Sequence, residues 1–587
     1  MGQYALIVAE AGWRKGYRLV NLLVRAGVPA FWLLDEATGT SGAEGQEAAL
    51  PRGSFLLGEE RHGAADRAQS KVIADLAGRA GVQLREYRRV AAPALLRLRA
   101  SRVAVYGGGG APFHHLYVLR SLGFVADPIM PEQIRCGALG AYAALAMPGG
   151  GWRAMEGQLC PLASAGCHAV ADFVRQGGLY LGSCAGSYDA AVVPETFHQR
   201  CPEQREMQLI NAAVWNSADP AWGGLASPGV GVVEVEGTRP DHPILFNLPP
   251  RFGMTHYNGP IFEPVSGRVP GASLAEGLVR FVGPTDRFTA AEHFLAPSAP
   301  EAERQPTLLE RAAQQGLYCV ICGRLDAGSV VLYGSHPEFG HDLSLFGALD
   351  GLEDSALLLA NALFWHAGTE ECRAGHDRVE PGWPALRAQP ASACLAAPRR
   401  RLDHLKRLLD ALSGPSGVTH GGSQASAWWL DQRHSMSVFG RSPAEIWQSE
   451  CGRMRSLTGR MGDELDRLGG LMDAVDAARA GDIPPQELGW AVRDCVYRRD
   501  QLWEQDGGYR GADALLAEAI EMLERALRLR ESPAPPPPQQ AYENADGNPF
   551  HLAVGSYLAA SGLLSAALLL IRSAAMALGD RALVSSG

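Results

Sequence analysis

Lysine is almost absent from this sequence of 587 residues. Only Lys15, Lys71 and Lys406 occur among its 53 basic residues, and all the others are arginine. A phosphate-binding loop of the Walker type needs a lysine after its glycine-rich stretch, because the ammonium group reaches the phosphates. No lysine follows the glycine-rich stretch Gly107–Gly110. This absence excludes a Walker-type nucleotide site, and the scarcity of lysine argues against Schiff-base chemistry.

The sequence also lacks the features of secreted, metal-binding and nucleic-acid-binding proteins. Its first residues do not follow the basic-then-apolar order of a signal peptide, and its 11 cysteines are an odd number. We therefore expect a cytoplasmic protein without a disulfide framework. Cys319 and Cys322 have the spacing of half a zinc site, but no second pair completes it, so we expect a core strand there. We expect no metal and no cofactor, and the net charge of −10 argues against a nucleic-acid partner.

The length and the changes in composition predict several domains. We expect a small α/β domain over residues 1–100 and a larger α/β domain over 101–370. A helical domain follows over 385–530, then a proline-rich linker over 531–541 and an apolar helix or tail over 542–587. Because proline-rich segments are extended, the linker is expected to separate the tail from the packed domains.

Residues 101–370 repeat one pattern of strand, glycine-rich turn and helix. Short apolar runs at 103–106, 141–147 and 179–181 each end in a turn and precede a segment with helical spacing. This alternation is typical of a doubly wound sheet whose strands are mostly parallel. The expected fold class is therefore α/β, with an N-terminal α/β unit and a C-terminal helical region.

The C-terminal half is predicted to be helical, and its end is ambiguous. Apolar residues recur at helical spacing from Leu402 to Leu412 and from Met454 to Met472, which predicts helices that could also bind a protein partner. Residues 551–571 contain no charged side chain and are long enough to cross a membrane. They are rich in alanine, serine and glycine, and Arg572 follows, so we favour a buried or partner-binding helix over a membrane anchor.

The strongest chemical signal is Gly182-Ser183-Cys184-Ala185-Gly186. A nucleophile on a sharp turn between a strand and a helix needs small residues on both sides. The free N–H groups at the start of the helix favour a thiolate, and the N–H of Ala185 could stabilise an oxyanion. A buried cysteine beside small packing residues is the alternative.

A second signal, Ser335-His336-Pro337-Glu338, follows another apolar run. A nucleophilic cysteine needs a base, and the base needs a group that orients it. His336 could accept the proton of Cys184. Glu338 could hold the other ring nitrogen of that histidine and stabilise the imidazolium.

Together these motifs resemble the class I glutamine amidotransferase-like superfamily, whose fold is flavodoxin-like. More narrowly, Gly107–Gly110, the PGGG at 148–151, the segment 177–188 and the HYNG at 256–259 resemble the N-terminal domain of biotin–protein ligase. The resemblance covers roughly residues 101–370. It does not extend to a biotin ligase, because no glycine- and arginine-rich adenylate loop and no catalytic lysine are visible.

The resemblance implies a role for ten residues. Cys184, His336 and Glu338 would form the catalytic triad, and the backbone of Gly149, Gly150 and Ala185 would form the oxyanion hole. The residues lining the substrate pocket would be Gly108, Gly109, Tyr257 and Asn258.

True glutaminases differ from this chain at one position. They carry a glutamine two residues after the second glycine, where this chain has Tyr188, so free glutamine is not the expected substrate. We expect hydrolysis of a small-molecule or peptide amide or ester, or acyl transfer, through a thioester. The alternative is a binding or scaffold module that kept the fold and lost the reaction.

Three smaller features have two interpretations each. His114 and His115 could meet an anionic ligand at a helix start or simply cap the helix. Asp189 could contact substrate, but a solvated helix residue is the default. Trp428 and Trp429 could anchor an interface or pack inside the helical domain.

Overall fold

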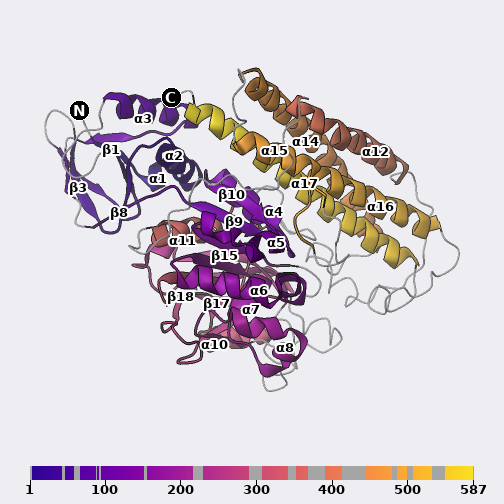
Figure 1. The fold of residues 1–587 in the computed structure, drawn as a ribbon, viewed down its shortest axis with the longest axis horizontal. Helices are drawn as coiled ribbons and strands as arrows, with labels where there is room; N and C mark the ends of the chain where they lie inside the picture. Colours follow the sequence, from indigo (N-terminus) through magenta and orange to yellow (C-terminus); the bar gives the residue numbers. More distant parts are fainter. Residues whose placement is uncertain are drawn as a thin grey trace.

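A computed structural model describes most of the chain (Figure 1). The described residues are 3–41, 46–58, 67–87, 89–91, 94–150, 155–215, 229–289, 307–341, 352–367, 390–412, 443–478, 486–498, 507–531 and 549–585. Trp428, Trp429 and the proline-rich segment 532–541 lie outside them, so the predictions for those residues stay predictions.

The N-terminal unit combines three helices with two sheets. The larger sheet has the strand order β6-β1-β5-β2-β8 and the smaller one the order β4-β3-β7, with every pairing antiparallel. The strands are β1 (Gln3–Leu6), β2 (Ala30–Leu33), β3 (Ala37–Ser41), β4 (Gln46–Leu50), β5 (Phe55–Leu57), β6 (Arg85–Tyr87), β7 (Arg89–Ala91) and β8 (Leu95–Arg97). The helices are α1 (Val8–Ala11), α2 (Trp13–Arg25) and α3 (Arg67–Ala80).

A sheet of 11 strands forms the centre of the molecule, and one half of it is parallel. In that half the order is β10-β9-β11-β12-β19, and each neighbouring pair runs in the same direction. These strands are β9 (Arg102–Tyr106), β10 (Val125–Ile129), β11 (Ala144–Met147), β12 (Leu179–Ser183) and β19 (Gly328–Tyr333). Their crossovers contain α4 (Pro112–Ser121), α5 (Pro131–Arg135), η1 (Ala138–Ala141) and α6 (Met155–Arg175). Because the carboxyl ends of parallel strands meet at one edge, the loops that follow them gather there.

The other half of the sheet is antiparallel, so the sheet is mixed. Its order continues β19-β18-β17-β14-β15, with β13 and β16 beside this path. The strands are β13 (Ala212–Val214), β14 (Val230–Gly237), β15 (Arg251–Tyr257), β16 (Phe262–Pro264), β17 (Glu276–Thr289) and β18 (Tyr318–Leu325). The short elements around them are α7 (Ala185–Ala190), α8 (Glu195–Arg200), η2 (Pro202–Met207), η4 (Pro243–Leu245), α10 (Leu308–Gln314), η6 (Asp354–Ala356) and α11 (Leu357–Ala367).

The prediction of a mostly parallel sheet is therefore wrong for this second half. The reason is visible at the connection from β18 to β19, which consists only of Asp326 and Ala327. Asp326 has a φ of 49°, the left-handed conformation that tight hairpin turns require. A two-residue loop can join only antiparallel strands, because a parallel pair needs a long crossover.

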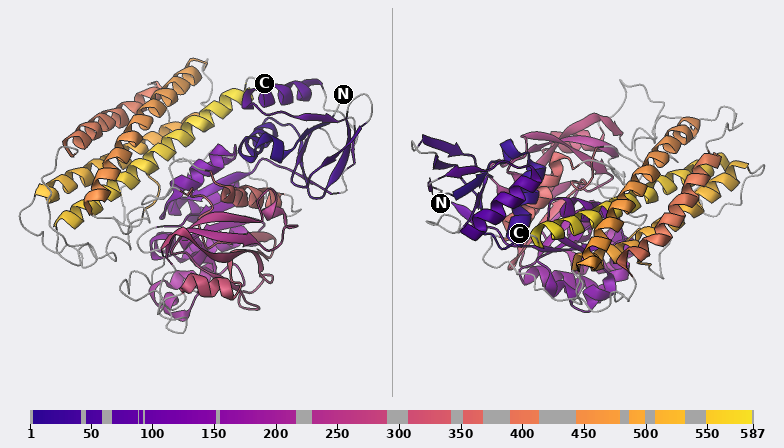
Figure 2. Two further views of the ribbon diagram at one scale, coloured as in Figure 1. Left: turned by 180° about the vertical axis from the view of Figure 1, so that it is seen from behind. Right: turned by 90° about the horizontal axis from the view of Figure 1, so that it is seen from above.

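The helical region packs as a bundle of long helices beside the sheet (Figure 2). Its elements are η7 (Ala391–Leu395), α12 (Ala396–Leu412), α14 (Pro443–Ala477), α15 (Gln486–Val496), α16 (Ala512–Glu531) and α17 (Pro549–Ser585). The apolar residues predicted at helical spacing are buried, among them Leu402, Leu405, Met454 and Leu465. The helical prediction for this region is confirmed for the described residues, because its apolar stripes form the bundle core.

The apolar C-terminal helix α17 is a central element of the structure. It packs against α14, α15 and α16 of the bundle and against α4 and α2, and its end lies beside the N-terminal unit (Figures 1 and 2). Its stretch Ser556–Asp580 is long and apolar enough to cross a membrane, yet 83% of its most apolar part is buried inside the molecule. The expectation that the linker separates the tail from the packed domains therefore does not hold in the structure.

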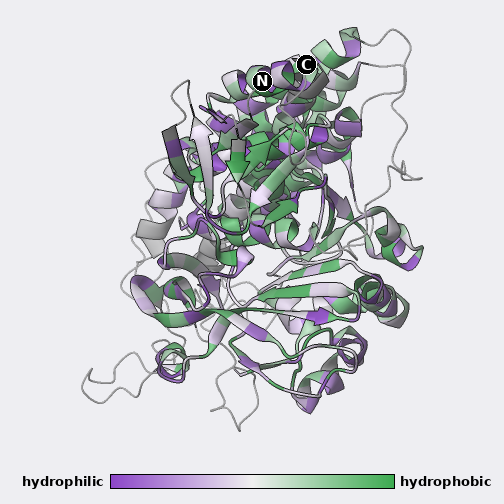
Figure 3. Ribbon diagram, turned by 90° about the vertical axis from the view of Figure 1, so that its left-hand side faces the viewer, coloured by the Kyte–Doolittle hydropathy of each residue, from purple (hydrophilic) through white to green (hydrophobic). Residues whose placement is uncertain are grey.

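Buried apolar residues from all three regions form one continuous core. Trp32 of the N-terminal unit, Val105 of the central sheet and Leu568 of α17 belong to the same buried cluster. Hydrophobic residues follow the strands of the sheet and the inner sides of the helices, as Figure 3 shows. Cys319 and Cys322 lie buried in β18, so the prediction of a core strand at this pair is confirmed.

Candidate active site

Cys184 lies on a strained turn between β12 and α7. Its backbone has a φ of 50° and a ψ of −110°, a conformation that is costly for any residue with a Cβ. The flanking glycines allow the chain to pass close to itself. A Cβ added to Gly182 would lie 2.5 Å from the carbonyl oxygen of Gly186, and one added to Gly186 would lie 2.3 Å from that of Met147. The sequence therefore folds locally into the sharp turn that presents a nucleophile.

His336 and Glu338 follow β19, the strand beside β12 in the sheet. The ring nitrogen Nδ1 of His336 lies 2.8 Å from Oε1 of Glu338, and both side chains are about 1% exposed. The backbone N–H of His336 donates to the carbonyl of Thr255 at 2.7 Å. The ring of Phe339 stacks on the imidazole with centroids 4.0 Å apart. The histidine is thus fixed in position and orientation from three sides.

The electrostatics of His336 connect it to Cys184. Burial alone lowers the pKa of His336, but the charges of Cys184 and Glu338, with hydrogen bonds to both, raise it to about 10. Burial raises the pKa of Glu338, whereas the neighbouring His115 and His336 and the hydrogen bond from His336 outweigh it and lower this pKa to about 2. His336 is therefore hydrogen-bonded to Glu338 and close enough to Cys184 for the two groups to affect each other's charge.

Of the three predicted backbone groups, Gly149 lies close to the side chains of His336 and Cys184. A Cβ added to Gly149 would lie 2.5 Å from Cε1 of His336 and 2.6 Å from Cβ of Cys184, so only glycine fits there. Gly150 has a φ of 85°. Ala185 is the first residue of α7, directly after the cysteine.

The predicted pocket residues divide into two groups. The carbonyl oxygen of Tyr257 accepts a hydrogen bond from the Cys184 thiol at 3.3 Å, and the adjacent Asn258 has a φ of 52°. Gly108 and Gly109 instead pack against Tyr106 and Gly157, because added Cβ atoms would lie 2.1 Å and 2.6 Å from atoms of those residues. The structure therefore brings the segment at 257–258 to the cysteine and places the two glycines against β9 and α6.

A second histidine contacts Glu338, and the sequence reasoning missed its role. His115 is fully buried, with Nε2 3.8 Å from Oε2 of Glu338 and 3.2 Å from Oγ of Ser183. Burial lowers its pKa, so it is neutral near pH 7. His114 is buried as well, with its ring 4.4 Å from that of Phe339. One feature of the sequence could have indicated a role for these two histidines. Both follow a glycine-rich turn at the same sheet edge as Cys184.

Asp189 also differs from its prediction as a solvated helix residue. The side chain is fully buried rather than solvated, and burial raises the pKa of its carboxyl well above the usual value, with a further contribution from Cys184. Tyr188, at the position where glutaminases carry glutamine, packs with its ring 6.0 Å from that of Phe197.

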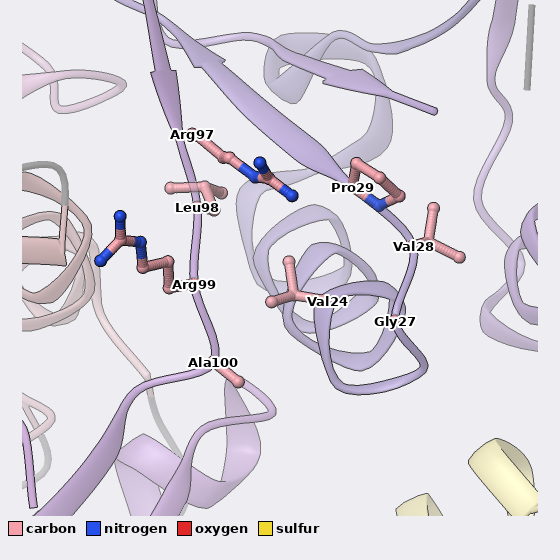
Figure 4. Close-up of a pocket in the computed structure, with 8 residues that line it drawn as sticks. All are labelled: Val24, Gly27, Val28, Pro29, Arg97, Leu98, Arg99 and Ala100. Atoms are coloured by element: carbon pink, nitrogen blue, oxygen red, sulfur yellow. The ribbon is translucent and has the colours of Figure 1, made fainter. Parts of the chain in front are cut away.

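A pocket at the surface lies apart from these residues (Figure 4). It is lined by the end of α2 and by the segment from Arg97 to Ala100, and none of the predicted site residues contributes to it.

Part of this region matches a known protein family. Residues 139–209, which contain β11, α6, β12, Cys184 and α7, match the family described as "Biotin-protein ligase, N terminal". The match ends before His336. No curated protein sequence matches the chain significantly.

Two solved structures align with about half of the chain at low identity. One is a ThuA-like protein from Bacteroides uniformis ATCC 8492, with 14% identity and a TM-score of 0.28, covering 47% of this chain and 95% of that one. The other is a ThuA-like protein from Parabacteroides merdae ATCC 43184, with 13% identity and a TM-score of 0.25, covering 46% of this chain and 90% of that one. Neither likeness bears on the reaction.

Proposed function

We propose that this protein is a cysteine-dependent hydrolase or acyltransferase with a class I glutamine amidotransferase-like fold. The observation that carries the proposal is the strained turn at Cys184, beside a histidine that Glu338 holds at 2.8 Å. The parallel half of the sheet and the family match over 139–209 support the fold assignment.

The thiol proton of Cys184 first moves to His336, and the resulting thiolate–imidazolium pair is the starting state of the cycle. The Cys184 sulfur then attacks the carbonyl carbon of an amide or ester. The N–H groups of Gly149, Gly150 and Ala185 stabilise the oxyanion of the tetrahedral intermediate. The bond to the leaving amine or alcohol then breaks, and His336 donates the proton that this group needs. The product is a thioester on Cys184.

The thioester is resolved by water or by an amine acceptor. His336, now neutral, accepts a proton from the incoming nucleophile, and the cysteine leaves as the thiolate. Glu338 keeps the ring oriented and stabilises the imidazolium whenever it forms. The cycle returns every group to its starting state and uses no cofactor.

The substrate of this reaction is a small-molecule or peptide amide or ester. Gly108, Gly109, Tyr257 and Asn258 border its binding pocket in this proposal. Free glutamine is not favoured, because Tyr188 packs against Phe197 where a glutaminase would carry its glutamine.

Electrophilic probes test this proposal without knowledge of the substrate. The purified chain is treated with a panel of fluorescent amide and ester electrophiles, with Cys184→Ala and the exposed-cysteine control Cys136→Ser beside it. We expect labelling of the wild type and of Cys136→Ser, and its loss in Cys184→Ala. Equal labelling in the wild type and Cys184→Ala would contradict the assignment of the nucleophile.

A binding module is the second candidate. Cys184 is 7% exposed and His336 only 1%, so little of either reacting group is open to a substrate, as expected if the fold was kept and the reaction lost. If the probes leave Cys184 unlabelled while a ligand still protects the folded chain from heat, this second candidate is preferred.

A further inference from the structure

Two cysteines and a glutamate converge where α6 packs against η2. Cys160 comes from α6, Cys201 from the junction of α8 and η2, and Glu203 from η2 itself. One sulfur or oxygen atom from each lies within 4.8 Å of the other two. The sequence spacing did not indicate this group, because Cys160 and Cys201 are 41 positions apart in the numbering.

The geometry of this cluster is close to that of a bound metal ion. Sγ of Cys201 lies 3.7 Å from Oε2 of Glu203. Two ligands on a tetrahedral zinc, with bonds of roughly 2.3 Å to sulfur and 2.0 Å to oxygen, lie about 3.5 Å apart. The sulfur of exposed Cys160 lies within 4.8 Å of the ligand atoms of Cys201 and Glu203.

A buried carboxyl group lies near the cluster, because the carbonyl of Asp189 accepts a hydrogen bond from Gln204, the neighbour of Glu203. Asp189 is fully buried, and neither of its carboxylate oxygens has a hydrogen-bond partner among the described residues. Buried carboxylates are normally paired with a cation or a donor, so a positive ion here would remove an unfavourable arrangement.

We propose that Cys160, Cys201 and Glu203 bind a zinc ion. Two sulfurs and one carboxylate oxygen favour zinc over calcium or magnesium, which prefer oxygen ligands alone. The exposed side of Cys160 leaves room for water as the fourth ligand and provides an entry path. Binding releases the two thiol protons to solvent.

The zinc would join two elements that support the candidate active site. Glu203 is followed by Gln204, whose side-chain amide donates to the carbonyls of Tyr188, Asp189 and Ala191. These carbonyls lie at the end of α7, whose first residue follows Cys184. The ion would therefore fix η2 against α6 and, through Gln204, the end of α7.

Metal content tests the site directly and does not depend on any enzymatic activity. The full chain, made without a polyhistidine tag, is kept reduced, dialysed against excess zinc and then against buffer, and its zinc is measured by plasma mass spectrometry. The variants are Cys160→Ser, Glu203→Gln and the control Cys136→Ser. Because Cys160 is exposed, its replacement should not disturb the core.

We expect about one zinc per chain in the wild type and in Cys136→Ser. Cys160→Ser and Glu203→Gln should each weaken zinc affinity by at least ~100-fold. Removing a residue that only hydrogen-bonds to a metal ligand already costs up to ~100-fold, and these two residues are ligands themselves. Wild-type chain that retains no zinc, or Cys160→Ser that retains it fully, would overturn the proposal. A third outcome would also overturn the proposal: a Cys160–Cys201 disulfide in unreduced protein and no zinc binding after reduction. That outcome would identify the two cysteines as a redox pair.

Discussion

At the scale of single residues, the candidate site depends on side chains that burial would normally disfavour. His336 and Glu338 tolerate burial because each is hydrogen-bonded to an oppositely charged partner. The sequence predicted these two and Cys184, because short motifs at strand ends carry the chemistry. It could not predict the contact of His115 with Glu338, because the two residues are 223 positions apart in the numbering and only the fold brings them together.

The reactivity of Cys184 should depend on both partners. We expect His336→Ala to slow alkylation of Cys184 by iodoacetamide at pH 6 by on the order of 10–100-fold, because the imidazolium beside the sulfur is lost. Glu338→Gln should slow it less, and the double variant should resemble His336→Ala, since the groups act as one unit. The measurement is peptide mass spectrometry of labelling over time, with Cys136 as the internal reference. Unchanged rates in all three variants would contradict a coupled triad.

The stability of the chain should fall in acid partly through Glu338. The folded state holds the pKa of Glu338 at about 2, below its usual 4.5, so the carboxylate stabilises the folded chain above pH 4.5. This contribution, on the order of 3 kcal/mol at most, is lost as the pH falls through 2. Urea unfolding at pH 7, 4 and 3 gives the difference in unfolding free energy between the wild type and Glu338→Gln. This difference should become smaller as the pH falls. A difference that stays constant over this range would contradict the lowered pKa.

At the scale of elements, the sequence predicted what local patterns determine. The strands β9, β11 and β12 of the parallel half and the amphipathic helices are found where the apolar runs indicated, whereas β10 was not predicted. The antiparallel half was missed because the direction of β19 relative to β18 depends on the tight turn at Asp326. The left-handed backbone of this residue is not apparent from the sequence Asp-Ala-Gly. The direction of a strand follows from the length of its connection, and apolar runs alone carry no information on it.

The turn around Cys184 should be intolerant of any side chain at its glycines. In Gly186→Ala the added Cβ would lie 2.3 Å from the carbonyl oxygen of Met147, so backbone must shift. We expect a loss of about 1–3 kcal/mol in unfolding free energy and reduced labelling of Cys184. The matched control is Gly459→Ala in α14, where no atom lies within 4 Å, and which should be neutral or stabilise by about 1 kcal/mol. Equal effects of the two changes on thermal unfolding would contradict the close approach at Gly186.

At the scale of the whole molecule, α17 unites the three regions. The uncharged stretch 551–571 left a membrane span open, because core helices and membrane spans both need long uncharged stretches, although its small residues favoured a buried helix. The structure places it inside, and its polar residues find partners in the body. Ser573 accepts a hydrogen bond from Arg120 at 2.9 Å, and Ser561 donates one to Glu450 at 2.8 Å.

Removing α17 should therefore unfold more than the tail. A chain that ends at Gln540 loses the helix against which α4, α14 and α16 pack, and it exposes their apolar faces. We expect aggregation, or a melting temperature many degrees lower, because a buried apolar face of this length cannot be left in water without cost. A soluble truncated chain that melts at the wild-type temperature would show that the tail does not belong to the core.

A substitution at Arg572 distinguishes a core helix from a membrane anchor, because the two predict opposite results. Its guanidinium lies 3.3 Å from Oε1 of Glu464 in α14 and over the ring of Tyr117 in α4, so it joins the bundle to the sheet region. In Arg572→Leu a core helix loses both contacts, and Glu464 is left without this partner. We expect a loss of about 1–2 kcal/mol in unfolding free energy.

A membrane helix would respond to the same change in the opposite direction. Leucine in place of arginine makes the segment more apolar and would increase the fraction of the chain that sediments with membranes. Thermal unfolding and membrane fractionation of the wild type, Arg572→Leu and the charge-preserving Arg572→Lys therefore decide between the two. Lysine keeps the charge but not the planar group that pairs and stacks, so a core helix predicts intermediate stability for that variant. Membrane retention that rises in Arg572→Leu without loss of stability would assign α17 to the bilayer.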